Sequence, residues 1–313
     1  MTLQALLVGV LCGEQMAKHP KRQQQLFGGA WTQGKLERVQ KYLRAYLQIF
    51  KKGSKGEYFS TIYVDAFAGS GYMQLPEMSE SVLFPEEFNE LKSEAYEYSK
   101  GSAVRALEID PGFSQYLFVE RDPHLATELR AVSERHSGKK IQIVTDDANV
   151  AIQQWCTKTD WEQTRAVVFL DPFGMQVDWK TVEALAATSG TDVWILFPIF
   201  AVNRMLVKHS KPPESWGTRL TTVFGTPDWE NEFYVVERSR LIDGVVSVQK
   251  TADVQKISDF YVGRLRRIFA GVSEPLVLRN SKGTPLFLLV FAASNARGAP
   301  TALKIAQHIL GNV

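Results

Sequence analysis

The regular alternation of short apolar strands with amphipathic helices, from residue 60 to residue 197, constrains this chain more than any other feature. Apolar runs predict the strands, and apolar residues spaced by three or four predict the helices between them. Strands are expected at 60–67, 116–120, 141–145, 166–170 and 193–197, with helices from 101 and at 123–136, 149–155 and 178–187. This order predicts an α/β fold, a mostly parallel sheet with helices on both faces, whose ligands lie at the carboxyl ends of the strands.

The regions on either side of this alternation are less regular. A basic amphipathic helix is expected at 35–50, and beyond Pro198 a helix is expected at 254–269, a strand at 285–292 and a closing helix at 300–310. We therefore expect an N-terminal extension at 1–34 and one domain at 35–313, with insertions at about 72–98 and 205–250.

Composition excludes several classes of protein. The two cysteines, Cys12 and Cys156, lie far apart, which argues against a disulfide framework or a four-cysteine metal site and fits a reducing, cytoplasmic compartment. The five histidines show no metal-ligand spacing, so no metal site is predicted. The apolar residues 2–12 are too short to span a bilayer and lack a basic start, so no membrane segment is expected.

The first strand runs into Asp65–Gly71, with the sequence DAFAGSG. Glycines allow a sharp turn and a close approach of the backbone to a ligand. The segment is neither the dinucleotide pattern GxGxxG nor a P-loop, and an acid at Asp65 suits a ligand with ammonium and hydroxyl groups better than a pyrophosphate. The alternative is a turn that needs small residues for packing only.

Acidic residues also end the next two strands. Glu120 could accept hydrogen bonds from two ribose hydroxyls, whereas an ion pair with Arg121 or capping of the next helix by Asp122 would be purely structural. The segment 145–149, TDDAN, could bind an adenine amino group or cap a helix. All these strand ends should converge on one crevice, so together they predict a nucleoside site.

The fourth strand ends in Asp171-Pro172-Phe173-Gly174. An exocyclic amine is a poor nucleophile because its lone pair is delocalised into the ring. Asp171 and the Pro172 carbonyl could accept the amine hydrogens and favour attack on a methyl sulfonium, while Phe173 stacks on the base. Alternatively, Asp171 caps the turn and Phe173 only packs.

With these motifs in this order, the chain resembles class I methyltransferases over about residues 31–310. More narrowly, it resembles the bacterial three-Cys-motif partner family, which is similar to the 23S ribosomal RNA adenine-N6 methyltransferases. The motifs that carry the resemblance are VDAFAGSG, GSAVRAL, FVERDP, DDAN and FLDPFG. The ribosomal RNA enzymes have an aromatic residue after AspProPro, whereas here Phe173 directly follows Pro172.

The resemblance implies a seven-stranded Rossmann-like sheet and S-adenosylmethionine as cofactor. It implies that Asp171, Pro172 and Phe173 are catalytic, and that the cofactor is bound by Asp65, Ala66, Phe67, Gly69, Gly71, Glu120 and Asp147.

Three hypotheses about the acceptor stay open. The chain could methylate a nucleic-acid base amine of the adenine N6 type, with RNA or DNA held by basic helices near 35–55 and 264–267. It could instead bind cofactor or a three-Cys-motif protein partner and be inactive alone. It could also methylate a protein or a small molecule at the same cofactor site.

Overall fold

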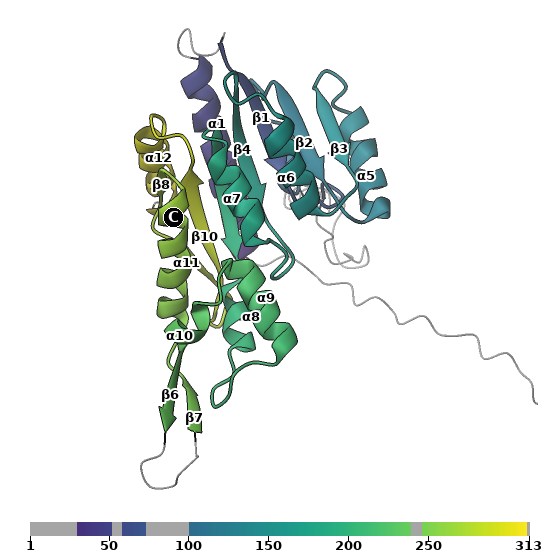
Figure 1. Cartoon of the computed structure of the whole chain (residues 1–313). Helices are drawn as coiled ribbons and strands as arrows, with labels where there is room; N and C mark the ends of the chain where they lie inside the picture. Colours follow the sequence, from purple (N-terminus) through teal and green to yellow (C-terminus); the bar gives the residue numbers. More distant parts are fainter. Residues whose placement is uncertain (1–29, 52–57, 73–99, 239–245, 312–313) are drawn as a thin grey trace, which may run out of the picture.

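A computed structural model of the chain describes residues 30–51, 58–72, 100–238 and 246–311 (Figure 1). Its helices and strands follow in this order: α1 (Ala30–Lys51), β1 (Ser60–Asp65), α4 (Ser102–Leu107), β2 (Gln115–Val119), α5 (Pro123–Glu134), β3 (Ile141–Val144), α6 (Ala148–Lys158), β4 (Thr164–Leu170), α7 (Trp179–Ala187), β5 (Thr191–Phe197), α8 (Ile199–Met205), α9 (Glu214–Phe224), α10 (Trp229–Phe233), β6 (Tyr234–Arg238), β7 (Val246–Lys250), α11 (Val254–Ile268), β8 (Gly271–Val272), β9 (Leu276–Arg279), β10 (Pro285–Ala293) and α12 (Ala299–Gly311).

An eight-stranded sheet forms the middle layer, in the order β3-β2-β1-β4-β5-β10-β8, with β9 also paired to β10. The strands β1 to β5 are parallel, and β10 is antiparallel to its neighbours β5, β8 and β9. The predicted α/β class with a mostly parallel sheet is confirmed. Seven strands were expected in this sheet, whereas the described residues form eight: β8 and β9, which are separated by a gap that contains Pro275, each pair with β10 at this edge.

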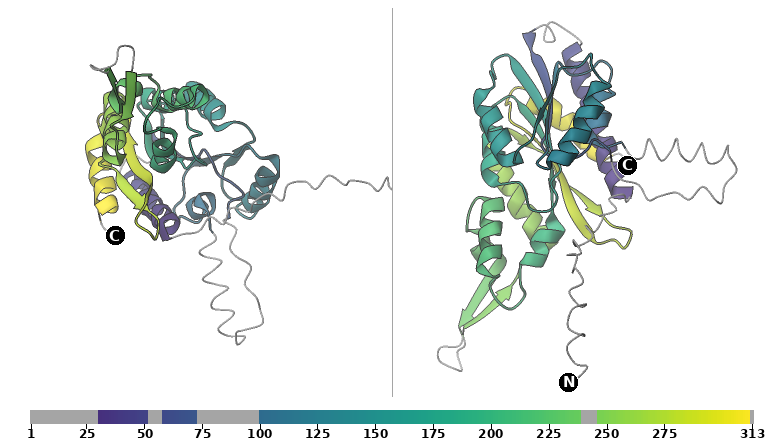
Figure 2. Two further views of the ribbon diagram at one scale, coloured as in Figure 1. Left: turned by 90° about the horizontal axis from the view of Figure 1, so that it is seen from below. Right: turned by 90° about the vertical axis from the view of Figure 1, so that its right-hand side faces the viewer.

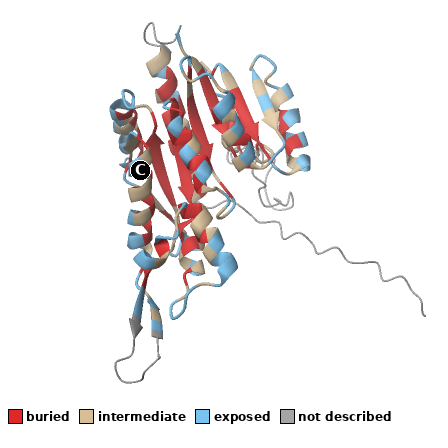
Figure 3. Ribbon diagram, in the orientation of Figure 1, coloured by how far each residue is buried: buried red, intermediate tan, exposed pale blue. Residues whose placement is uncertain are grey.

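Helices cover both faces of the sheet (Figure 2) because its strands alternate apolar side chains between two cores. In β4, Val168 and Leu170 belong to the core beneath α6, α7 and α11, whereas Val167 and Phe169 belong to the core beneath α1, α4, α5 and α12. The strands are consequently buried along most of their length (Figure 3). The sequence of a strand that is buried on both faces is a continuous run of apolar residues, and this is the pattern seen here.

The strand order fixes where a ligand would bind. From β1 the chain continues to β2 and β3 on one side, whereas β4 and β5 lie on the other side of β1. Loops that follow β1 and β4 therefore leave in opposite directions, and a crevice opens between them at the carboxyl ends of the strands.

The predicted insertion at 205–250 contains α9, α10, β6 and β7, which extend beyond the carboxyl end of the sheet (Figure 1). The insertion predicted at 72–98 lies outside the described residues except for its first residue, and so does the N-terminal extension up to residue 29. Helix α1 begins at Ala30, earlier than the predicted start at Lys35. Among the described residues, none of the helices combines the length and apolar character needed to cross a bilayer.

Candidate functional site

Asp65 ends β1 and is fully buried beneath the turn that follows. Its Oδ1 accepts a hydrogen bond of 3.2 Å from the backbone N–H of Phe67. Burial raises the pKa of Asp65 to about 7, a hydrogen bond with Ser102 lowers it, and the nearby Asp171 carboxylate raises it again. Asp65 therefore stabilises the turn from its buried side.

The glycine turn after β1 requires glycine at two positions. Gly69 and Gly71 have φ values of +60° and +86°, which side chains rarely tolerate. A Cβ at Gly71 would also lie 3.3 Å from side-chain atoms of Leu129 and Val104. This conformation directs the backbone N–H of Gly69 towards Glu120.

Glu120, at the end of β2, links this turn to the next helix. Its Oε2 accepts from the Gly69 N–H at 2.9 Å, and its Oε1 accepts from the Asp122 N–H at 2.7 Å. Asp122 also caps α5, as the structural alternative expected. A carboxylate offers about four lone-pair positions, so the Glu120 carboxylate retains positions for a diol after these two bonds.

Asp147 caps α6 by accepting from the Asn149 N–H at 2.9 Å. The Asn149 side chain is also occupied. Its Nδ2 donates to the Gln176 carbonyl at 2.9 Å, and its Oδ1 accepts from the Asp178 N–H and the Thr181 hydroxyl at 2.9 and 2.8 Å. Asn149 thus ties the start of α6 to the loop that follows β4.

Asp171, at the end of β4, is paired with a lysine of α1. The Lys35 Nζ lies 2.7 and 2.6 Å from the two carboxylate oxygens of Asp171 and 5.2 Å from the ring centre of Trp31. The Lys35 and Asp171 side chains are 7% and 20% exposed, so water screens this ion pair only partly. Pro172 is buried, whereas Phe173 is 56% exposed.

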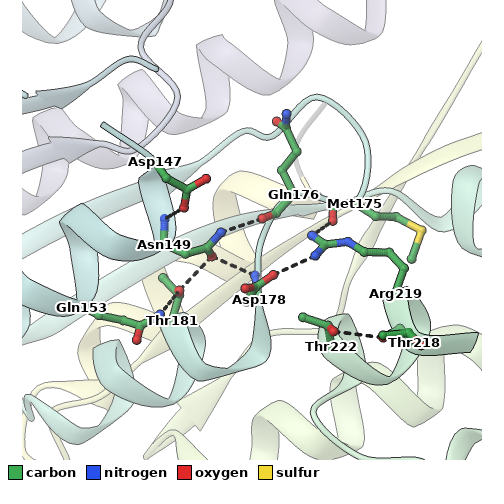
Figure 4. Close-up of polar contacts among 10 residues, drawn as sticks. All are labelled: Asp147, Asn149, Gln153, Met175, Gln176, Asp178, Thr181, Thr218, Arg219 and Thr222. Carbon is green, nitrogen blue, oxygen red and sulfur yellow. Dashed lines mark hydrogen bonds and ion pairs between the residues drawn. The ribbon is translucent and has the colours of Figure 1, made fainter. Parts of the chain in front are cut away.

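The rest of the loop, 173–178, is held by one internal hydrogen bond and by two helices. The Gln176 side chain accepts from the Phe173 N–H at 3.0 Å, and Asn149 holds the loop from α6. Arg219 reaches from α9 to the Asp178 carboxylate at 2.9 Å and also donates to the Met175 carbonyl (Figure 4). Helix α9, from the segment predicted to be an insertion, therefore takes part in shaping the candidate site.

Two adjoining clefts lie at this edge of the sheet, and Phe67 and Phe173 line both. The acidic cleft, of about 480 Å³, includes Glu120, Asp146, Asp147, Asp178, Arg121 and Arg219. The aromatic cleft, of about 600 Å³, includes Trp31, Thr32, Lys35, Tyr72, Asp171 and Phe287. A further cavity of about 670 Å³ lies among α7, α9 and α10 and contains none of the residues singled out from the sequence.

The structure brings the residues singled out from the sequence together at these clefts. All of them line one or both clefts except Asp65, which is buried behind the turn: Ala66, Phe67, Gly69, Gly71, Glu120, Asp147, Asp171, Pro172 and Phe173. The motifs recognised in the sequence do not include Trp31, Thr32, Lys35, Arg219 or Phe287, which also line the clefts. Their spacing along the chain carries no signal, because each reaches the site through tertiary packing.

The strand order and the crevice between β1 and β4 define the chain as a Rossmann-like, doubly wound α/β protein. No family model and no curated protein matches its sequence. Similar solved structures include a Legionella pneumophila protein of the family model DUF519, 14% identical over 91% of this chain and 92% of that one, with a TM-score of 0.48. They also include an S-adenosylmethionine-dependent methyltransferase from Clostridium acetobutylicum, 10% identical over 82% and 91%, with a TM-score of 0.33. Because both TM-scores are below 0.5, the fold class rests on this chain's own strand order.

Proposed function

We propose that this chain is an S-adenosylmethionine-dependent methyltransferase whose cofactor spans both clefts. The observation that carries the proposal is the pairing of an acidic cleft with an aromatic one at the switch point of the sheet. Glu120 would accept from the ribose hydroxyls, and Asp147 from the adenine amine. Phe67 and Phe173 line both clefts, and aromatic faces attract a cation such as the sulfonium.

The acceptor group in this proposal is an exocyclic amine. Asp171 and the Pro172 carbonyl accept the amine hydrogens, and the nitrogen lone pair attacks the methyl carbon. When bound, S-adenosylmethionine would supply the methyl group and keep the electron pair of the C–S bond on its sulfur, and one amine proton would pass to water. Lys35 leaves lone pairs free on both Asp171 oxygens, so Asp171 remains able to accept from the amine.

A nucleic-acid base with an adenine N6-type amine is the acceptor we favour, since Phe173 exposes an aromatic ring beside Asp171. Helix α1 contributes little positive charge there. Lys35 lies beside Asp171, while Tyr42 bonds Asp192 at the opposite end of the sheet, so the exposed Lys41 and Arg44 lie far from Asp171. Phosphates of RNA or DNA would therefore have to be bound by other residues.

A second candidate function is a module that needs a protein partner for turnover, as resemblance to the three-Cys-motif partner family implies. The exposure of Phe173 favours it, because a partner could cover this ring and complete the site.

Calorimetric titration with S-adenosylmethionine tests the cofactor. We expect micromolar binding by the wild type and a loss of about 10- to 100-fold in Glu120→Ala, because hydrogen bonds to a charged group are worth about 1.5–3 kcal/mol. Glu274→Ala is the matched control, since that exposed glutamate pairs with Arg266 outside both clefts. Equal affinity of wild type and Glu120→Ala would contradict this placement of the cofactor.

Transfer of labelled methyl groups to RNA and DNA then tests the acceptor. Activity of the purified chain that is lost in Asp171→Ala, which removes the acceptor oxygens, would support the amine mechanism and exclude the partner-dependent module. Absence of transfer despite cofactor binding, with nucleic-acid affinity undetectable even in low salt, would exclude a nucleic-acid acceptor.

A further inference from the structure

One wall of the aromatic cleft is formed by residues to which the proposed binding of the cofactor gives no role. This wall consists of Trp31 and Thr32 from the first turn of α1 and Phe287 from β10. We propose that these three residues form the platform that binds the methyl acceptor, and that the acceptor is an uncharged, planar heteroaromatic amine of the nucleobase type. This inference rests on the proposed function.

Trp31 and Phe287 supply a stacking surface. Their rings are stacked, with centroids 4.9 Å apart and planes inclined by 27°. Both residues are only half-buried and both line the cleft, so apolar ring surface remains available in it. Aromatic rings of this kind bind planar bases by stacking, at about 1–3 kcal/mol per base.

The buried hydroxyl of Thr32 is a second observation, independent of the two aromatic rings. Residue Thr32 is 4% exposed and lines the cleft, and its hydroxyl has no hydrogen-bond partner among the residues that the structure describes. A buried hydroxyl without a partner lowers stability, and few are found in native proteins. The hydroxyl oxygen itself is sealed from solvent. A rotation about χ1 would turn it into the cleft, where a ligand edge with a ring nitrogen or carbonyl would satisfy it and a purely apolar ligand would not.

The charge of the cleft defines the ligand further. Among the described residues that line it, the charged ones are Lys35 and Asp171, and these two pair with each other. The described lining therefore offers no unpaired charge to a phosphate or carboxylate, whereas Asp171 still has lone pairs for an amine. A neutral heterocycle with an amino group fits both conditions.

The test is to titrate the protein with four nucleosides, with and without saturating S-adenosylhomocysteine. Binding is measured by quenching of tryptophan fluorescence and by calorimetry. We expect adenosine and cytidine, which have an exocyclic amine, to bind about tenfold tighter than inosine and uridine, which have a carbonyl there. Trp31→Leu and Phe287→Leu should weaken adenosine binding about 5- to 100-fold. Trp216→Leu, a change at an exposed tryptophan outside the cleft, should leave it unchanged.

Thr32→Val separates binding from a packing role. Valine keeps the shape and removes the hydroxyl, so adenosine binding should weaken about two- to tenfold while the melting temperature of the free protein rises. A lower melting temperature would mean that the hydroxyl already has an internal partner, and the inference would be wrong. Weaker S-adenosylhomocysteine binding in Thr32→Val would assign this hydroxyl to the cofactor instead.

The remaining outcomes distinguish the platform from the cofactor proposal. A wild type that binds S-adenosylhomocysteine but none of the four nucleosides would overturn the acceptor class and leave the cofactor proposal intact. A wild type that binds amino nucleosides but no S-adenosylhomocysteine would overturn the cofactor proposal, while the loss of nucleoside affinity in Trp31→Leu would still support the platform.

Discussion

Lys35 and Asp171 are 136 residues apart in the chain and share one ion pair at the candidate site. Both side chains are largely buried, and Lys35 also lies over the ring of Trp31. The charge of each residue is tolerated at this depth because the other neutralises it. Removing either partner alone would leave an uncompensated charge next to the candidate catalytic turn.

We expect Lys35→Met to lower the free energy of unfolding by about 2–4 kcal/mol, because it leaves the Asp171 carboxylate without its partner. The double variant Lys35→Met with Asp171→Asn should recover most of that loss, since it removes both charges. Urea unfolding of the wild type, of the single variants Lys35→Met and Asp171→Asn, and of the double variant measures the coupling between the two residues. Strictly additive losses would show that the ion pair contributes nothing to stability.

At the scale of elements, the loop between β4 and α7 is held by three helices. Helix α1 holds Asp171 through Lys35, α6 holds Gln176 through Asn149, and α9 holds Met175 and Asp178 through Arg219. The loop is thus positioned by its surroundings. Gly174, at φ +74°, allows the chain to turn within it.

Replacement of Arg219 by glutamine should loosen this loop. We expect faster amide hydrogen exchange over residues 172–178, because the bonds to Met175 and Asp178 are lost or weakened, and a fall in kcat of about tenfold with little change in cofactor affinity.

Lys211→Ala is the matched control for this variant, since Lys211 belongs to the same segment, 205–250, and its described hydrogen bond and ion pair are with Glu230. Unchanged exchange over 172–178 in Arg219→Gln would contradict a positioning role for α9.

At the scale of the whole molecule, two acids sit at opposite ends of the sheet. Asp65 lies at the carboxyl end of β1, and Asp192 lies at the start of β5, where it accepts a 2.6 Å hydrogen bond from Tyr42. Burial raises the pKa of Asp65 to about 7 and that of Asp192 to about 6. In the unfolded chain both carboxyls titrate near pH 4.

At these two carboxyls the folded protein therefore binds more protons than the unfolded chain between about pH 4 and pH 7, so their contribution to stability should fall as pH rises through that range. Each group contributes a slope of at most about 1.4 kcal/mol per pH unit. Asp192→Asn should flatten the decline between pH 4 and 6 and leave the Asp65 contribution up to pH 7. Chemical unfolding at several pH values measures this, and an unchanged slope in Asp192→Asn would contradict it.

Much of the fold could be predicted from local sequence. The strand from 166 to 170 is a run of apolar residues because β4 is buried on both faces, and the glycines after β1 mark positions with positive φ. The sequence also predicted that acids at successive strand ends would meet, since parallel strands place their carboxyl ends at one edge of the sheet.

The sequence by itself therefore determined the α/β class, the strand ends and the residues that follow them, because periodicity and backbone conformation are local properties. Only the tertiary structure decided which distant residues complete the site. Lys35, Trp31 and Thr32 reach it through the docking of α1, Phe287 through the antiparallel strand β10, and Arg219 through helix α9. These contacts depend on how helices pack across the sheet, and packing between elements distant in sequence leaves no periodic signal in a single chain.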